Sequence, residues 1–272
     1  MPEGDTVWLA ARRLDDVLAG RLITHSDFRV PQLATADLSG RKVTEVASRG
    51  KHLLLRTDDG LTLHTHLRMD GAWHRYAAGA RWSGGPGWQV RVVISNDEWQ
   101  AVGYRLPVVE LLRTTDESRV VGHLGPDLLG DDWDPAEAAR RLASQPDRAI
   151  APALLDQRNL AGIGNLYANE IAFLCGVTPW QPVRDVDLHA AVEHAHRLLD
   201  ANKTFDAQPT TGSRRRGEEH WVYRRANRPC HRCGDRIREA MQPEADRPEH
   251  ARVSFWCPTC QAGPAPSAVT EL

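Results

Sequence analysis

The spacing of hydrophobic residues changes near the middle of the chain. At the start, Val7, Ala11, Leu14 and Leu18 fall on one face of a helix that Gly20 would close. Beyond it, apolar and polar positions alternate, as they do in β-strands with one buried face. We predict strands at residues 42–48, 53–55, 61–67, 72–76 and 90–95. The first part of the chain is therefore predicted to be a short helix followed by a β-rich region that ends near residue 124.

Turn and cap residues support this division. Asp5 or Thr6 can cap the first helix, and Asp58-Asp59-Gly60 is typical of a β-hairpin turn. Later, Asp134-Pro135-Ala136-Glu137 is typical of a helix N-terminus. Further helices are predicted at residues 154–160, 165–175 and 187–202, and residues 203–220 are predicted to be a loop.

Four cysteines form two tight pairs, Cys230 with Cys233 and Cys257 with Cys260. Two residues separate the members of each pair, so one turn can present both sulfurs to one ion, and two turns complete a tetrahedral zinc site. Four thiolates leave no open position, so we expect one structural Zn²⁺ ion in a zinc finger at residues 221–262. The alternative is two disulfides in a secreted chain, which the polar start of the sequence disfavours.

Charge is unevenly distributed along the 272 residues. The formal net charge is −2, yet residues 203–238 hold ten Lys and Arg against four Asp and Glu. Basic residues beside a zinc finger favour a phosphate-backbone contact, although such a run is also typical of a solvated face. No run of about 18 apolar residues occurs, so no membrane partner is expected. The scarcity of lysine relative to arginine is typical of a GC-rich bacterial genome.

The N-terminus, Met1-Pro2-Glu3-Gly4, offers a possible nucleophile. Initiator methionine is readily removed before a small residue, which would leave Pro2 as a secondary amine. Such an amine can attack an aldehyde-like carbon to form an iminium ion, and the positive end of the next helix favours its neutral form. Glu3 could then transfer protons. Taken alone, the segment is more simply interpreted as a flexible start.

A second candidate site is the turn Gly162-Ile163-Gly164 followed by Asn165. Glycines let the backbone approach a ligand, and the positive end of the next helix is a suitable site for a phosphate. Asn165 would add a donor. The simpler alternative is a helix C-cap followed by an ordinary N-cap.

Together, these motifs resemble those of the formamidopyrimidine-DNA glycosylase and endonuclease VIII family of base-excision enzymes. They follow the family's order along most of the chain: Pro2-Glu3-Gly4, Arg49-Gly50-Lys51, Leu124-Gly125-Pro126-Asp127, Leu155-Asp156-Gln157, Gly164-Asn165-Leu166-Tyr167 and the four cysteines. The resemblance implies an α+β multidomain fold. Its parts would be an N-terminal helix and β-sandwich (residues 1–124), a helix–two-turn–helix domain (131–220), the zinc finger and a disordered tail (263–272), with DNA between the lobes.

The resemblance also implies catalytic and phosphate-binding roles. Pro2 would attack C1′ of a damaged nucleotide, and Glu3 would help to open the sugar. Lys51, on a predicted strand, would assist β-elimination. Asn165 and Arg252 would hold phosphates beside the lesion, and Arg252 is linked to δ-elimination. In isolation, Lys51 and Arg252 would be interpreted as ordinary solvated residues.

Four further residues are implied DNA contacts. Arg68 and Met69 lie where the family places the loop that fills the gap left by a flipped nucleotide. Arg105 would reach the opposite strand, and His123 stands where relatives carry a basic DNA contact. Met69 taken alone could equally be a partly buried core residue.

Two features depart from the family pattern. Asp70 stands where endonuclease VIII has an aromatic residue, and an acid there would repel phosphate. The segment 234–256 between the cysteine pairs is longer than the usual spacing, so we expect an extended hairpin tip near residues 241–249.

The predicted function is that of a DNA glycosylase with AP-lyase activity, acting on oxidised bases. Pyrimidines are favoured because the Pro-Glu-Gly start resembles the endonuclease VIII branch. Two alternatives are a non-catalytic protein that binds damaged or single-stranded DNA, and a zinc-ribbon transcription factor. The expected protein is a bacterial, cytoplasmic, nucleoid-associated monomer whose partner is damaged double- or single-stranded DNA.

Overall fold

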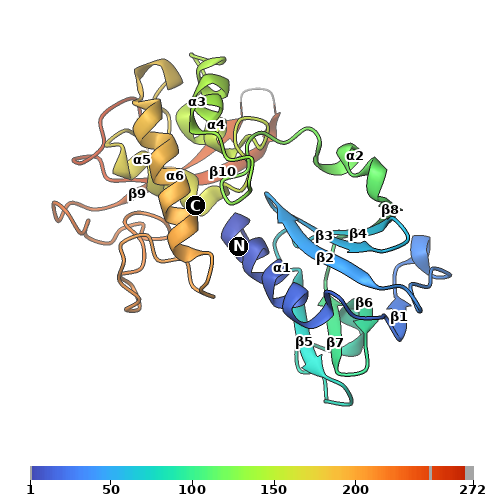
Figure 1. Ribbon diagram of the computed structural model, residues 1–272. Coiled ribbons are helices and arrows are strands. Elements are labelled where there is room, and N and C mark those ends of the chain that lie inside the picture. Colours follow the sequence, from blue (N-terminus) through green and yellow to red (C-terminus); the bar gives the residue numbers. More distant parts are fainter. Residues whose placement is uncertain (1, 245–246, 267–272) are drawn as a thin grey trace. The chain divides into compact units, whose positions relative to one another are not determined.

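The computed structural model describes residues 2–244 and 247–266 (Figure 1). Its contacts separate two compact units, Met1–His123 and Leu124–Leu272. Each unit is described by itself. Among the described residues, no helix is long and apolar enough to cross a membrane.

Unit 1 is a β-sandwich preceded by a helix (Figure 1). One sheet has the strand order β1-β6-β7-β5 and the other β2-β3-β4-β8, and every pair within them is antiparallel. The strands are β1 (His25–Phe28), β2 (Val43–Arg49), β3 (His52–Thr57), β4 (Leu61–His66), β5 (Ala72–Ala77), β6 (Val90–Ser95), β7 (Trp99–Tyr104) and β8 (Val108–Arg113). Helix α1 (Gly4–Leu18) packs against β2 and also contacts β3, β5 and β7. The connections include η1 (Pro31–Leu33), η2 (Gly87–Gln89), η3 (Thr114–Asp116) and α2 (Ser118–Val121).

The sandwich core follows from the alternation in the sequence. Leu53 and Leu55 of β3 point into it together with Leu63 of β4 and Val92 of β6, and each of these side chains is fully buried. The intervening residues of β3 and β4 therefore lie on the opposite face of the sheet β2-β3-β4-β8. That outer face carries polar side chains, which become important below.

Several predicted boundaries in unit 1 were wrong. Helix α1 begins at Gly4 with Glu3 as the N-cap residue, so Asp5 and Thr6 lie inside the first turn instead of capping it. Strands β1, β7 and β8 were not predicted. Their alternation is weak because β8 carries apolar residues at adjacent positions and β1 has only four residues.

Unit 2 contains helices and a β-hairpin (Figure 1). The helices are α3 (Pro135–Ala143), α4 (Ile150–Leu155), α5 (Asn165–Leu174) and α6 (Leu188–Asn202), with the short η4 (Val183–Asp185) between the last two. Strands β9 (Arg238–Glu244) and β10 (Arg247–Trp256) pair antiparallel. The predicted hairpin tip near 241–249 includes residues 245–246, which lie outside the described residues.

The predicted helix at residues 154–160 was wrong. Helix α4 begins at Ile150 and ends at Leu155, because Asp156 takes an extended conformation. Pro152 lies in the first turn of this helix, where its missing N–H is not needed. The Asp156 side chain accepts the Arg158 backbone N–H at 3.1 Å, which turns the chain away from the helix.

The finger hairpin and the helices of unit 2 share one hydrophobic core. Val222, Ile237 and Phe255 from the finger pack in the same buried cluster as Ile171 and Phe173 of α5. The finger is therefore not a separate layer with its own small core. Residues 263–266 of the predicted tail are described, and the Pro264 carbonyl accepts a hydrogen bond from Thr178; residues 267–272 lie outside the described part.

Two buried polar side chains of α5 also fasten the finger. The Glu170 carboxylate accepts the successive backbone N–H groups of Trp221, Val222 and Tyr223 at 2.8–2.9 Å. It also accepts the hydroxyl of Thr210. The preceding residue of the same helix, Asn169, accepts the N–H of the finger residue Phe255 at 2.6 Å.

Candidate functional site

The start of α1 places an imino acid next to a buried carboxylate. Pro2 is half-buried, and Glu3, the N-cap residue, is fully buried. The Glu3 carbonyl accepts the N–H of Val7 at 3.1 Å, which fixes the backbone at this end of the helix. A buried carboxylate at the positive end of a helix is well placed to hold or release a proton.

Lys51 lies in a tight turn and not on a strand as predicted. Strands β2 and β3 are joined by Gly50 and Lys51 alone, because Arg49 pairs with His52. Gly50 has φ +55°, a conformation that glycine adopts without strain. The two-residue connection leaves Lys51 at the tip of a hairpin with a half-buried side chain.

Histidines gather next to this turn on the outer face of the sheet. His52 stacks on His64 with ring centroids 5.1 Å apart, and His66 meets His52 edge-on at 4.9 Å. His123, a predicted DNA contact, is exposed and approaches the His52 ring at 6.2 Å. Burial and the neighbouring cationic groups lower the pKa of His52 to about 3, and burial followed by Arg68 lowers the pKa of His66 to about 4. Both rings are therefore neutral near pH 7.

The predicted gap-filling residues border one cavity with Arg105. The cavity, of about 480 Å³, is lined by Arg68, Met69, Asp70, Arg91, Arg105, Leu106 and Pro107. Met69 is 60% exposed, so it is not a core residue. The Arg105 guanidinium donates to the Asp70 carbonyl at 2.9 Å and also contacts the Gln89 side chain, which fastens the loop after β4. Arg68 and Arg105 both have φ +49°, an uncommon conformation for non-glycine residues.

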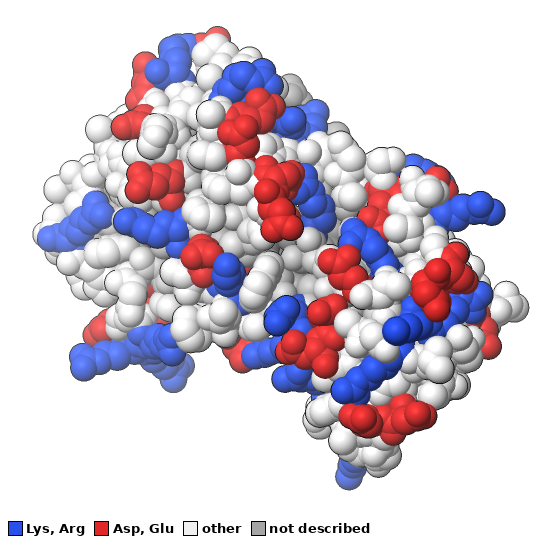
Figure 2. All heavy atoms as spheres, viewed as in Figure 1, with Lys and Arg blue, Asp and Glu red and all other residues white. Residues whose placement is uncertain are grey.

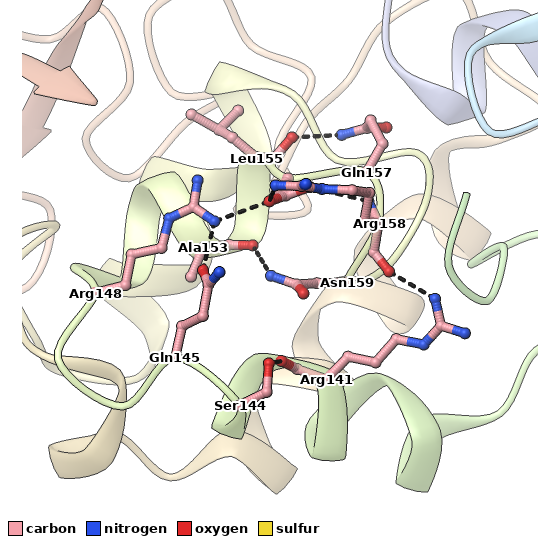
Figure 3. Close-up of polar contacts among 10 residues, drawn as sticks. Arg141, Ser144, Gln145, Arg148, Ala153, Leu155, Gln157, Arg158 and Asn159 are labelled. Atoms are coloured by element: carbon pink, nitrogen blue, oxygen red, sulfur yellow. Dashed lines mark hydrogen bonds and ion pairs between the residues drawn. The ribbon is translucent and has the colours of Figure 1, made fainter. Parts of the chain in front are cut away.

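In unit 2, a hydrogen-bonded network shapes the turn before α5 (Figure 3). Asp156 accepts from Arg148 at 2.8 Å and from Arg158 at 2.7 Å, and these bonds hold its pKa well below the usual range despite burial. Figure 3 also shows Asn159 donating to the Ala153 carbonyl, at 2.9 Å. The carboxylate thus holds α4 and the following turn in one arrangement.

The Gln157 side chain braces the glycine turn. Its amide donates to the carbonyls of Leu155 at 2.7 Å and Ile163 at 2.9 Å, and its oxygen accepts the Gly162 N–H at 3.0 Å. The backbone carbonyl of Gln157 accepts the N–H of Gly125. A Cβ atom added at Gly125 would lie 2.6 Å from the carbonyl oxygens of Arg158 and Asn159, so only glycine fits there. These contacts explain why the Asp-Gln and Leu-Gly-Pro-Asp motifs occur together.

Asn165 and Arg252 are brought together. Asn165 is the first residue of α5, and its side-chain amide donates to the Val253 carbonyl at 2.9 Å. Arg252, the preceding residue of β10, is exposed and pairs with Gln242. The Asn165 amide thus ties the start of α5 to the finger strand that carries Arg252.

The four cysteines form a cluster whose geometry suits a metal ion. All four sulfur atoms lie within 4.8 Å of one another. The Cys230 and Cys260 sulfurs are 3.9 Å apart, and those of Cys233 and Cys257 are 3.4 Å apart. Sulfurs bound about 2.3 Å from a tetrahedral zinc ion would lie about 3.8 Å apart, so the residues fit a Cys₄ centre. The Cys230 carbonyl accepts the Gly234 N–H at 3.0 Å, which closes the first cysteine turn.

Charged side chains are intermixed over most of the face shown in Figure 2. Basic side chains gather at the lower left, near the loop that follows α6 in Figure 1. Arg214, Arg215 and Arg216 in this loop are exposed, and the Arg214 guanidinium lies 3.8 Å from the centre of the Phe205 ring.

Sequence reasoning did not identify the histidines at positions 52, 64 and 66. It also missed the Glu170 clamp, that is, the buried carboxylate that accepts three successive backbone N–H groups of the finger. The alternation of β3 and β4 contained a signal for the histidines, because it places all three on the face opposite Leu53, Leu55 and Leu63. Nothing in the local sequence indicated that Glu170 would be buried against a segment fifty residues later. Cys175 caps the C-terminus of the same helix, α5, and burial raises the pKa of its thiol to about 11.

Comparisons with known proteins agree with the motifs. Residues 1–107 match the family model for the formamidopyrimidine-DNA glycosylase N-terminal domain, and residues 124–203 match the H2TH domain of the same enzyme. The chain is 58% identical over 269 residues to "Probable endonuclease 8 2" of Streptomyces coelicolor, covering 98% of this chain and 96% of the relative. It is 44% identical to "DNA-(apurinic or apyrimidinic site) lyase Nei2" of Mycolicibacterium smegmatis, covering 96% of this chain and 99% of that protein.

More distant relatives share the architecture. Formamidopyrimidine-DNA glycosylase of Chloroflexus aggregans is 34% identical, covering 96% of this chain and 98% of that protein. A solved structure of the Lactococcus lactis formamidopyrimidine-DNA glycosylase, bound to DNA containing an AP site, is similar with a TM-score of 0.78 at 22% identity. That match covers 96% of this chain and 100% of the other, and it supports the fold alone.

Proposed function

The chain belongs to the formamidopyrimidine-DNA glycosylase family, and from that premise we propose that it is a bifunctional DNA glycosylase and AP lyase of base excision repair. The observation that carries the proposal is the pairing of Pro2 with the buried Glu3 at the start of α1. A protein that only bound DNA would need neither an imino nucleophile nor an adjacent carboxyl group.

In the proposed reaction, removal of Met1 leaves the imino nitrogen of Pro2 as the nucleophile. Its lone pair attacks C1′ of the flipped nucleotide, the bond from C1′ to the base breaks, and the base leaves with a proton. Glu3 protonates the ring oxygen as the sugar opens, which produces an iminium ion between Pro2 and C1′. Loss of a proton from C2′ then expels the 3′ phosphate by β-elimination, a step that Lys51 assists.

DNA binding is assigned to both units. In unit 2, Asn165 and Arg252 would bind phosphates beside the lesion, supported by their association through Val253. The four cysteines would hold one structural Zn²⁺ ion that keeps Arg252 on an ordered strand. In unit 1, Met69 would fill the gap left by the flipped nucleotide, supported by its exposure, with Arg68, Arg105 and His123 as further contacts.

We assign oxidised pyrimidines as the preferred substrates. The Pro-Glu-Gly start resembles the endonuclease VIII branch, and the relatives that carry the endonuclease 8 or Nei2 name are 58% and 44% identical to this chain. The formamidopyrimidine-DNA glycosylase of Chloroflexus aggregans is 34% identical. The proposed enzyme is a monomer of the bacterial cytoplasm, associated with the nucleoid, and it acts on damaged duplex or single-stranded DNA.

Borohydride trapping on a duplex with an abasic site tests the reaction. The processed protein should form a covalent adduct, and Pro2→Gly should lose most trapping and excision while binding is largely kept. Pro31→Gly, at an exposed position in the same unit, is the matched control and should be trapped like the parent protein. Protein that retains Met1, identified by intact mass, should form no adduct.

Failure of correctly processed protein to be trapped would sink the enzyme proposal and favour the binding-protein alternative. Cleavage of a panel of defined oxidised bases tests the substrate assignment separately. A preference for oxidised purines in that panel would contradict it without touching the mechanism.

A further inference from the structure

We infer that Glu110, His64 and His52 form a hydrogen-bonded chain across three strands that positions Lys51 for β-elimination. This histidine chain rests on the proposed function, because it acts through Lys51. His52 and His64 are positioning residues in it, since neither is assigned a contact with DNA.

The strand register places the three residues on one face of the sheet. His64 of β4 pairs with Glu110 of β8, and His52 of β3 pairs with His66, two residues from His64 on β4. The ring nitrogen Nδ1 of His64 lies 3.0 Å from a Glu110 carboxylate oxygen, and its Nε2 lies 2.8 Å from Nδ1 of His52. His64 is 3% exposed, so these two hydrogen bonds take the place of the hydrogen bonds that its ring would make with water.

The protonation of each ring nitrogen follows from the partners. A carboxylate only accepts hydrogen bonds, so Nδ1 of His64 carries the proton that it donates to Glu110. In the proposed arrangement each ring carries one proton, so Nε2 of His64 is the acceptor and Nδ1 of His52 donates to it. Nε2 of His52 is consequently the unprotonated nitrogen of that ring.

Burial and the neighbouring groups keep His52 neutral. Burial, followed by His66, His64, His123 and Lys51, lowers the pKa of its ring to about 3. Arg68 faces His66 from the loop after β4, while Glu117 faces His64 from the segment that covers the sheet. Arg119 lines a hollow with Glu110 on that same face.

This arrangement has a direct consequence for Lys51. His52 follows Lys51 immediately, and the connection between β2 and β3 contains only Gly50 and Lys51, so an anchored His52 ring fixes the base of the lysine side chain. A neutral ring also adds no negative group that would compete with a DNA phosphate for the lysine. The histidine chain therefore restricts the position of Lys51 without neutralising the charge of its ammonium group.

The first test measures single-turnover β-elimination on a preformed abasic duplex between pH 6 and 9, with borohydride trapping in parallel. His64→Leu should lower the elimination rate about tenfold, roughly the worth of one charge-assisted hydrogen bond, while trapping through Pro2 is unchanged. His64→Gln, whose side-chain oxygen can accept from His52, should restore most of the rate.

The matched control is His25→Gln, at an exposed position of β1. Loss of trapping by the parent protein would refute the proposed function itself. Normal trapping with a His64→Leu rate within about twofold of His25→Gln at every pH would overturn the histidine chain alone. Thermal unfolding of each variant identifies a folding defect.

A second test does not depend on activity or on the leucine variant. Nitrogen-15 NMR of the full-length protein should show both His52 and His64 protonated on Nδ1 and unprotonated on Nε2 near pH 7. A His52 ring protonated on Nε2 would overturn the inference.

Discussion

The Glu170 clamp gives the sharpest quantitative prediction. Oε1 of this carboxylate accepts from Val222 and Tyr223, and Oε2 accepts from Trp221 and from the Thr210 hydroxyl. In Glu170→Gln, the amide oxygen can keep the Val222 and Tyr223 bonds. The amide nitrogen then faces the Trp221 N–H, which loses its acceptor, whereas the Thr210 hydroxyl can turn to accept from the amide.

We expect Glu170→Gln to lower the free energy of unfolding of unit 2 by about 2 kcal/mol, the cost of one buried donor without a partner. Glu170→Ala removes the acceptor from three backbone N–H groups and should cost at least about 4 kcal/mol. Urea unfolding followed by tryptophan fluorescence is a suitable assay, with the transition of unit 1 fitted separately.

Glu193→Gln is the control, since Glu193 is an exposed residue of α6 in the same unit and should stay within about 0.5 kcal/mol of the parent protein. If Glu170→Gln were no less stable than Glu193→Gln, the three backbone N–H groups would have to be satisfied by other means. The explanation of how α5 holds the finger would then be wrong.

Three further predictions follow from the structure. His66 binds fewer protons in the folded than in the unfolded protein, so it adds about 3 kcal/mol to the free energy of unfolding of unit 1 above pH 6.5, and this is lost as the pH falls toward 4. The free energy of unfolding of unit 1, measured with urea, should therefore fall over that pH range, and a constant value would contradict burial of His66 as a neutral ring. Cys233→Ser should lower the bound zinc measured by mass spectrometry and weaken DNA binding measured by fluorescence anisotropy, whereas an unchanged zinc content would exclude Cys233 as a ligand. Arg105→Gly should be more stable than Arg105→Ala by about 1 kcal/mol in urea unfolding, because both lose the Asp70 and Gln89 contacts but only alanine retains the cost of φ +49°; equal stabilities would argue against that backbone conformation.

The sequence predicted features that depend on local chemistry. The cysteine pairs specified a cluster because two intervening residues define a turn, and the leucines of β3 and β4 specified a buried face because strand periodicity is two. The family resemblance, which family models and relatives confirm, came from short motifs of the same local kind.

Features that depend on distant partners could not be predicted in this way. The end of α4 at Leu155 reflects bonds from Asp156 to Arg148 and Arg158, and the segment itself contains nothing that excludes another turn of helix. Glu170 lies in an apolar run where a glutamate would ordinarily face solvent, and its partners are fifty residues away. The placement of Lys51 in a turn depends on the register that pairs Arg49 with His52.

The common core of α5 and the finger hairpin also limits how related sequences can be recombined. A crossover between homologues at residues 123 and 124 would leave each packed interior inherited from a single parent. A crossover near residue 220 would combine Ile171 and Phe173 from one parent with Val222, Ile237 and Phe255 from the other. Hybrids joined near residue 220 should tolerate far less divergence between their parents. The finger should therefore be exchanged between homologues only together with the helices of unit 2.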